Sequence, residues 1–131
     1  MSFETASRSA EKRLQDNWAA TPVAWDNKAF KQPRGTPWIR YQMSWGGAVQ
    51  IAIKTSRESG VIMIGVFTPK GDGPRANHSL CDTIAALYRN WQEGYLFCEA
   101  PYVERVGEDE EWFHQNVVIP FYYDNCFEEV V

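Results

Sequence analysis

Between residues 60 and 91 the pattern of hydrophobic residues changes from that of a strand to that of a helix. Gly60–Phe67 is apolar on both faces, which predicts a strand covered from both sides rather than one at an edge. A loop rich in Gly and Pro follows at Thr68–Pro74. Pro74 suits the first position of a helix, and apolar residues three and four apart continue to Trp91. This stretch predicts a buried strand, a loop and an amphipathic helix.

Alternating apolar and polar residues predict two further strands before the buried one. The first is Trp38–Trp45, whose aromatic and apolar face either packs in the core or anchors a partner chain. The second is Ala48–Thr55, and Gly46-Gly47 between them is expected to form a tight hairpin turn, because glycine tolerates positive φ. The residues of the second strand expected to face inward are Val49, Ile51 and Ile53.

The ends of the chain supply the remaining elements. Ser2–Ala20 reads as a helix that Thr21-Pro22 ends. Val23–Pro37 is then a long connection, either pinned by its two aromatic residues or mobile. Tyr95–Val106 reads as a strand whose Pro101 indicates an edge or a bulge, and Trp112–Tyr123 as the last strand.

The predicted order of elements is therefore α-β-β-β-α-β-β. This order predicts an α+β fold, in which two helices pack on one face of a mostly antiparallel sheet of about five strands. The length of 131 residues predicts a single domain over residues 1–131.

Composition narrows the class of protein. Hydrophobic residues make up 44% and aromatic residues 15% of the chain, which predicts a packed core. Six Trp exceed what one core of this size needs, so some are expected at a contact surface. Three Cys without CxxC spacing fit a reducing compartment. The N-terminus lacks the pattern of a signal peptide, and no apolar run is long enough to span a membrane, so no membrane partner is expected.

Charge is unevenly distributed along the chain. The formal net charge is -4, with cations concentrated before Arg89 and acids in Glu104–Glu111 and Asp124–Glu129. Such runs either form a solvated surface or allow molecules to stack positive end to negative end. General nucleic-acid binding is disfavoured, because phosphate contacts require clustered Lys and Arg.

Groups that could carry chemistry are sparse. His78 and Cys81 share a helix face, but a metal site needs more ligands than these two. Gly71–Arg75 precedes a helix but lacks the Gly-Lys-Ser/Thr of a phosphate-binding loop. The adjacent acids Asp109, Glu110 and Glu111 are more typical of a solvated turn than of a cation site. We therefore predict no catalytic, metal-binding or cofactor-binding residues, and no enzyme activity.

Two segments carry a family resemblance. Ser59–Ala76 contains Val-Phe-Thr-Pro-Lys-Gly-Asp-Gly and leads into a helix that ends in Leu87-Tyr88-Arg89. The last strand contains Trp112 and, five residues on, Val117-Val118-Ile119-Pro120-Phe121. In these patterns the chain resembles the tail terminator-like proteins of long-tailed bacteriophages, over nearly its whole length. The motifs are structural rather than catalytic.

The resemblance implies a structural virion protein in the neck region of the tail, assembled in the host cytoplasm. Its subunits would form a ring, a hexamer, that caps the head-proximal end of the tail tube and stops polymerisation. The implied partners are further copies of the chain, the tail tube protein and the head connector. DNA would pass through the lumen without sequence-specific binding, past local cations such as Arg34, Arg40 or Lys54.

Two loops are the candidates for the tube and connector contacts, because turns that flank rigid strands usually carry binding residues. The candidate residues are Trp45, Gly46 and Gly47 in one loop and Lys70, Asp72 and Arg75 in the other. Two alternative functions remain open from the sequence. One is another phage neck or tail-tube component, and the other is a small-ligand-binding domain or an enzyme.

Overall fold

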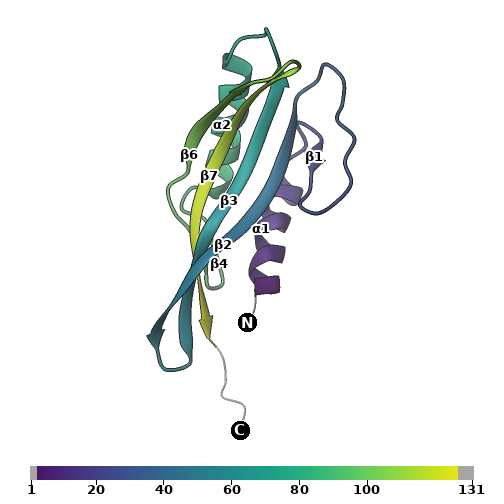
Figure 1. Ribbon diagram of the computed structural model, residues 1–131. Helices are drawn as coiled ribbons and strands as arrows, with labels where there is room; N and C mark the ends of the chain where they lie inside the picture. The colour runs from purple at the N-terminus through teal and green to yellow at the C-terminus, as the bar shows by residue number, and fades with distance from the viewer. Residues whose placement is uncertain (1–2, 127–131) are drawn as a thin grey trace.

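Two helices lie over one face of a long, twisted sheet in the computed structural model, which describes residues 3–126 (Figure 1). The helices are α1 (Phe3–Asn17) and α2 (Arg75–Tyr88). The described residues form seven strands: β1 (Val23–Ala24), β2 (Trp38–Ala52), β3 (Thr55–Pro69), β4 (Gln92–Glu93), β5 (Leu96–Cys98), β6 (Tyr102–Glu108) and β7 (Trp112–Cys126). The strand order is β1-β2-β3-β7-β5-β4, and β6 also pairs with β7.

The predicted α+β class and the mostly antiparallel sheet are confirmed, whereas the count of about five strands is wrong. Of the described pairings, only that of β1 with β2 is parallel. The additional strands are short pieces: β1 lies inside the long connection, and β4 has two residues. The predicted strand Tyr95–Val106 is divided into β5 and β6 around Pro101, and both pieces pair with β7.

The first predicted helix differs from α1 at its ends. The structure begins α1 at Phe3 and ends it at Asn17, whereas the prediction continued to Ala20. The proposed cap, Ser2, lies outside the described residues. Pro74 stands at the N-cap of α2 rather than at its first helical residue, and α2 ends three residues before Trp91.

The central position of β3 is confirmed. It pairs with β2 along one side and with β7 along the other. Ile62, Ile64 and Val66 are fully buried toward the helices. Phe67, on the opposite face, stacks on Trp38 with ring centroids 4.0 Å apart. A strand with apolar residues on both faces is stable only where both faces are covered, as they are here.

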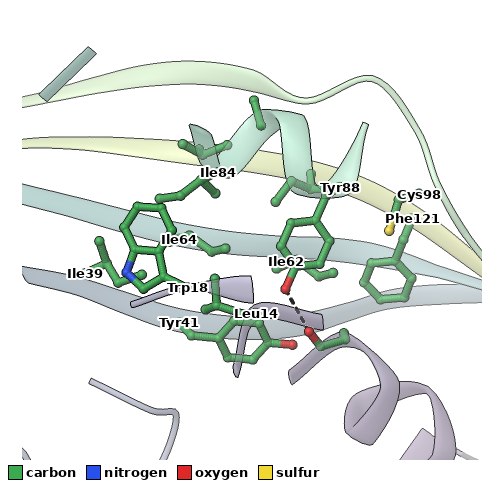
Figure 2. Close-up of a cluster of buried hydrophobic side chains, with 14 of the residues drawn as sticks. Leu14, Trp18, Ile39, Tyr41, Ile62, Ile64, Ile84, Tyr88, Cys98 and Phe121 are labelled. Carbon is green, nitrogen blue, oxygen red and sulfur yellow. Dashed lines mark hydrogen bonds between the residues drawn. The ribbon is translucent and has the colours of Figure 1, made fainter. Parts of the chain in front are cut away.

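The main core fills the space between the helices and the sheet (Figure 2). Leu14 of α1 and Ile84 of α2 are fully buried there against Ile39 and Ile64 of the sheet. The Tyr88 hydroxyl donates a hydrogen bond of 2.7 Å to the carbonyl oxygen of Ala10, which joins the two helices. This bond satisfies the polar end of a side chain that is otherwise surrounded by apolar groups.

The long connection at residues 23–37 is pinned by its aromatic residues. Trp25 packs against Tyr41, with ring centroids 5.5 Å apart. Phe30 packs against Trp38 at 5.2 Å and belongs to a second, smaller cluster that includes Trp112. Of the two expectations for this segment, the structure supports the pinned loop.

The three strands predicted between residues 38 and 67 are present as two, because the first predicted turn is wrong. Gly46-Gly47 is not a hairpin turn: β2 continues through it to Ala52, and the chain turns at Ile53-Lys54. Lys54 takes the positive φ of 63° that the turn requires. The pairing of β2 with β3 shifts register between Trp45 and Gly47, so Gly46 is the extra residue of a β-bulge. A glycine pair is compatible with a hairpin turn or with a β-bulge. The alternation of apolar and polar residues on either side does not distinguish the two.

The bulge and the end of the helical cover together explain why the inward-facing residues of the second predicted strand are wrong. One extra residue moves the following side chains to the other face of the sheet, as far as a second register shift between Gln50 and Ala52. Ala48 is now opposite the buried Glu58, on the helix side, and Val49 is opposite the exposed Arg57. The residues expected to face inward are exposed at 67%, 47% and 84% for Val49, Ile51 and Ile53.

Gly60 marks the place where β2 and β3 approach too closely for a side chain. A Cβ atom at Gly60 would lie 2.0 Å from the carbonyl oxygen of Ser44 and 3.0 Å from the ring of Phe121. Gly47, close by on β2, has open space around it. The absent side chain at Gly60 therefore allows the strands to pair beside the bulge.

We expect Gly60→Ala to destabilise the fold by about 2–4 kcal/mol, because backbone atoms cannot move aside as side chains do. Gly47→Ala is the matched control and should change the free energy of unfolding by less than about 0.5 kcal/mol. Urea denaturation followed by circular dichroism measures both. Equal stability of the two variants would contradict the close approach at Gly60.

Candidate contact surfaces

The loop between β3 and α2 carries three of the predicted contact residues on a well-defined backbone. The side chains of Lys70, Asp72 and Arg75 are all exposed. Gly71 and Gly73 take φ values of 94° and 79°, which residues with a Cβ rarely adopt. Alternating glycines thus shape this loop, and its charged side chains face solvent.

Asn77 fixes the start of α2 to the sheet directly behind this loop. Its amide nitrogen donates to the carbonyl oxygens of Val66 (2.9 Å) and Phe113 (3.2 Å). Its amide oxygen accepts from the side chain of Gln115 at 3.0 Å. Asn77 is fully buried, and its network joins α2, β3 and β7. The position of the loop is therefore determined by a polar contact in the core.

Asn77 was not among the residues predicted from the sequence to be functional. A signal was available, because Asn77 precedes Cys81 by four residues and Ile84 by seven, and so lies on the apolar stripe of the helix. A polar residue on such a stripe needs buried partners. Those partners come from β3 and β7, and the helical spacing contains no information about them.

The turn between β6 and β7 lies beside the same loop. The Lys70 backbone N–H donates to the Glu111 carbonyl oxygen at 2.9 Å. The Asp109 carboxylate accepts from the N–H groups of Trp112 (2.7 Å) and Glu111 (2.8 Å). These two donors lower the pKa of Asp109 below its usual value. The acidic run thus forms a turn closed by its own first carboxylate.

Loop and turn together form one end of the molecule. A hollow of about 290 Å³ lies between them, lined by Gly71, Gly73, Pro74, Arg105, Glu108 and Phe113. Arg105 lies over the ring of Phe113, 5.1 Å from its centroid, and 4.0 Å from Glu108. We call this end, residues 70–75 with residues 108–111, the loop end.

The other predicted contact segment is not a loop. Trp45 is half-buried in β2, and its ring packs edge-on against Phe121 at 5.0 Å and Phe3 at 4.9 Å. Its side chain therefore contributes to the core rather than to a free surface. Gly46 forms the bulge, and Gly47 is exposed within the strand.

The structure shows a different contact candidate nearby. Beyond the bulge, β2 and β3 continue as a hairpin past the ends of the helices, and we call residues 46–57 the arm (Figure 1). The arm and the loop end lie at opposite ends of β3, which is roughly 50 Å long at 3.3 Å per residue. The structure thus separates the two candidate surfaces rather than bringing them together.

A third surface feature lies under the long connection. A hollow of about 520 Å³ is lined by residues that include Trp25, Lys28, Phe30, Trp38 and Arg40. The indole nitrogen of Trp38 and Nε of Arg40 have no hydrogen-bond partner there. Both atoms are covered by protein, so they do not form an open binding site.

The His, Cys, Asp and Glu side chains of residues 3–126 are dispersed. No group of three or more His, Cys, Asp or Glu side chains in this range could hold a metal ion. Cys81 is buried and donates to the amide oxygen of Asn77 at 3.4 Å. Burial raises the pKa of Cys81 and of Cys98 to about 12 each, so both are protonated and unreactive at neutral pH. No helix in this range is long and apolar enough to cross a membrane.

The comparison with protein families identifies the class of the protein. The family model for the phage tail terminator protein matches residues 6–121, which is most of the chain. The chain therefore belongs to the phage tail terminator family, a family of structural phage proteins that points to the virion tail.

No curated protein matches the sequence. The comparison with solved structures bears on the fold alone. One solved structure has 24% sequence identity and a TM-score of 0.67, covering 98% of this chain and 99% of that chain. A likeness at this identity shows that the whole fold is shared.

We expect Asn77→Ala to lower the free energy of unfolding by about 2–4 kcal/mol, because the buried amide of Gln115 and the carbonyl groups would lose their partner. Ser79→Ala, an exposed position two residues further along α2, is the matched control and should be near neutral. Urea denaturation measures both, and a neutral Asn77→Ala would show that water replaces the amide.

Reaction with iodoacetamide at pH 8 should modify the folded protein once, at the exposed Cys126. A thiol with a pKa of about 12 is ionised to about one part in ten thousand at pH 8, and burial also excludes the reagent. In denaturant all three cysteines should react. Intact-protein mass measures the number of adducts, and Cys126→Ser should give none in the folded state.

Proposed function

We propose that this protein is the tail terminator of a long-tailed phage. Copies of the chain form a hexameric ring at the head-proximal end of the tail tube. The ring stops tube polymerisation and offers its far face to the head connector. The protein assembles in the host cytoplasm and remains in the neck region of the virion. The match to the family over residues 6–121 carries this proposal.

The separation of the two ends supports a part that joins two partners. A terminator has the tube on one side and the connector on the other, so its subunit needs two contact surfaces that face apart. The loop end offers one such surface, and the opposite end of β3 lies most of a strand length away from it. A rigid central strand also keeps their spacing constant.

The ring itself requires two unlike patches on each subunit, because a closed head-to-tail contact is heterologous. A stable contact of this kind buries on the order of 800 Å² per partner. The uneven distribution of charge along the chain is compatible with such a contact. DNA passes through the lumen without sequence-specific contacts, near cations such as Arg34 or Arg40.

Replacing Lys70, Asp72 and Arg75 together with Ala should leave folding unchanged and impair tail completion. All three side chains are exposed, so their loss removes contacts to a partner and not to the core. We expect a fall in infectious titre of at least about tenfold in a complementation assay, which corresponds to a loss of about 1.4 kcal/mol if titre follows one binding step.

The matched control is the triple substitution of Arg8, Lys12 and Asp16 with Ala on α1. It removes the same charges, two cations and one anion, from an exposed helix face. Exposed ion pairs contribute little to stability, so this variant should fold and complement normally. Normal titre from the loop variant would contradict a contact role for the loop end.

The ring is tested by light scattering coupled to size-exclusion chromatography over a wide concentration range. A discrete species of six subunits, or a ring formed on purified tail tubes, supports a terminator. Open-ended polymers of variable mass would instead indicate a tube subunit. Microscopy of lysates that lack the protein should show overlong tubes, since nothing would then stop their growth.

A further inference from the structure

The exposed large apolar side chains within residues 3–126 gather mainly in two places. Val49, Ile51 and Ile53 form one group on the arm. Tyr102, Val103 and Val106, exposed at 54%, 44% and 54%, form the other along β6, with Tyr102 and Val103 on opposite faces of the strand, and we call them the edge patch. Phe3 and Tyr95 are the remaining exposed members of this class. Exposed apolar groups that cluster in this way usually mark interaction surfaces.

The two groups cannot cover each other within one chain. β6 pairs with residues 113–118 of β7, whereas the arm strand β3 lies beside Asp124–Cys126. The six steps from residue 118 to residue 124 span roughly 20 Å along β7. The two groups are therefore separate and unlike, which is what each subunit needs for a head-to-tail contact.

The residues of the arm and the residues around the edge patch carry opposite net charge. The arm contains Lys54 and Arg57 and no acidic residue. Residues 99–111, around the edge patch, contain six acidic residues against one cation, Arg105. Arg57 pairs with Asp124 at 2.8 Å, and Lys54 lies in the turn at the tip of the arm. A cationic tip and an acidic rim attract each other and guide the encounter.

Resting on the proposed function, we propose that the arm of one copy docks on the edge patch of a second copy and forms the contact between ring neighbours. The apolar side chains of Val49, Ile51 and Ile53 pack along the open edge of β6 beside the edge patch, and Lys54 lies against the acidic residues around β6. The open side of β6, which has no strand partner among residues 3–126, receives the arm. The contact needs no change in the core, because both surfaces are already exposed.

Disulfide cross-linking of the full chain tests this contact. All variants carry Cys126→Ser, which leaves the two buried thiols as the remaining natural cysteines. Ile51→Cys and Val103→Cys are made separately, mixed and oxidised with copper phenanthroline. We expect cross-linked dimers in the mixture at a level at least tenfold above each variant alone. The double variant should give a ladder of multimers, because every copy then carries both halves of the contact.

Ile51→Cys mixed with Ala86→Cys is the matched control, because Ala86 is exposed on α2, outside both surfaces. This mixture should give only background cross-linking. Ile53→Cys with Tyr102→Cys provides a second pair in case one variant folds poorly, which circular dichroism would reveal. Dimers from Ile51→Cys alone would overturn the proposal in favour of an arm-to-arm contact.

The failure of this contact is distinguishable from the failure of the terminator assignment. A ring seen by light scattering or on tail tubes, with neither cysteine pair cross-linked, overturns the arm contact and leaves the terminator in place. Absence of any ring, in solution or on tail tubes, overturns both. Cross-linked ladders together with a ring support both.

Discussion

A difference in length between helices and strands determines the shape of this protein. Helices of 15 and 14 residues are about 22 Å long at 1.5 Å per residue. The three long strands have 15 residues each, and a strand of that length spans about 50 Å. The helices pack over only part of the sheet, so one end of the β2–β3 hairpin extends as the arm.

The bulge at Gly46 lies close to where this cover ends. Up to Trp45 the odd-numbered residues of β2 face the helices, and Ile39 and Tyr41 are fully buried among them. After Gly46 the faces exchange, and the arm presents Val49 on the face opposite the helices. A change of face is tolerated there, because the core no longer specifies which side is apolar. The bulge and the close approach at Gly60 are thus two parts of one junction between core and arm.

The sequence predicted the features that repeat over many residues. The buried strand at Gly60–Phe67, the second helix and the edge strand broken at Pro101 follow from period, proline and glycine, and all three are present. Single local choices were not predictable. Gly46-Gly47 suits a turn or a bulge, and only the length of the opposing strand determines which one forms. Two-residue strands such as β1 are defined by partners distant in sequence.

The same limit applies to the contact surfaces. Lys70, Asp72 and Arg75 were found in an exposed loop because Gly and Pro identify loops locally. Asn77 was overlooked because its partners lie 11, 36 and 38 residues away in the chain. The arm was overlooked because its alternating apolar residues are equally suited to a buried strand, and exposure depends on where the helices end.

The junction at Gly46 and Gly60 also divides the chain into parts under different evolutionary demands. The buried residues of the core must remain compatible with one another, since a change of one methylene group is felt there. Beyond the junction, residues 48–53 of the arm are exposed and contribute little to the free energy of folding. This segment can therefore change its sequence quickly as its partner changes, while a slowly changing core keeps the same frame.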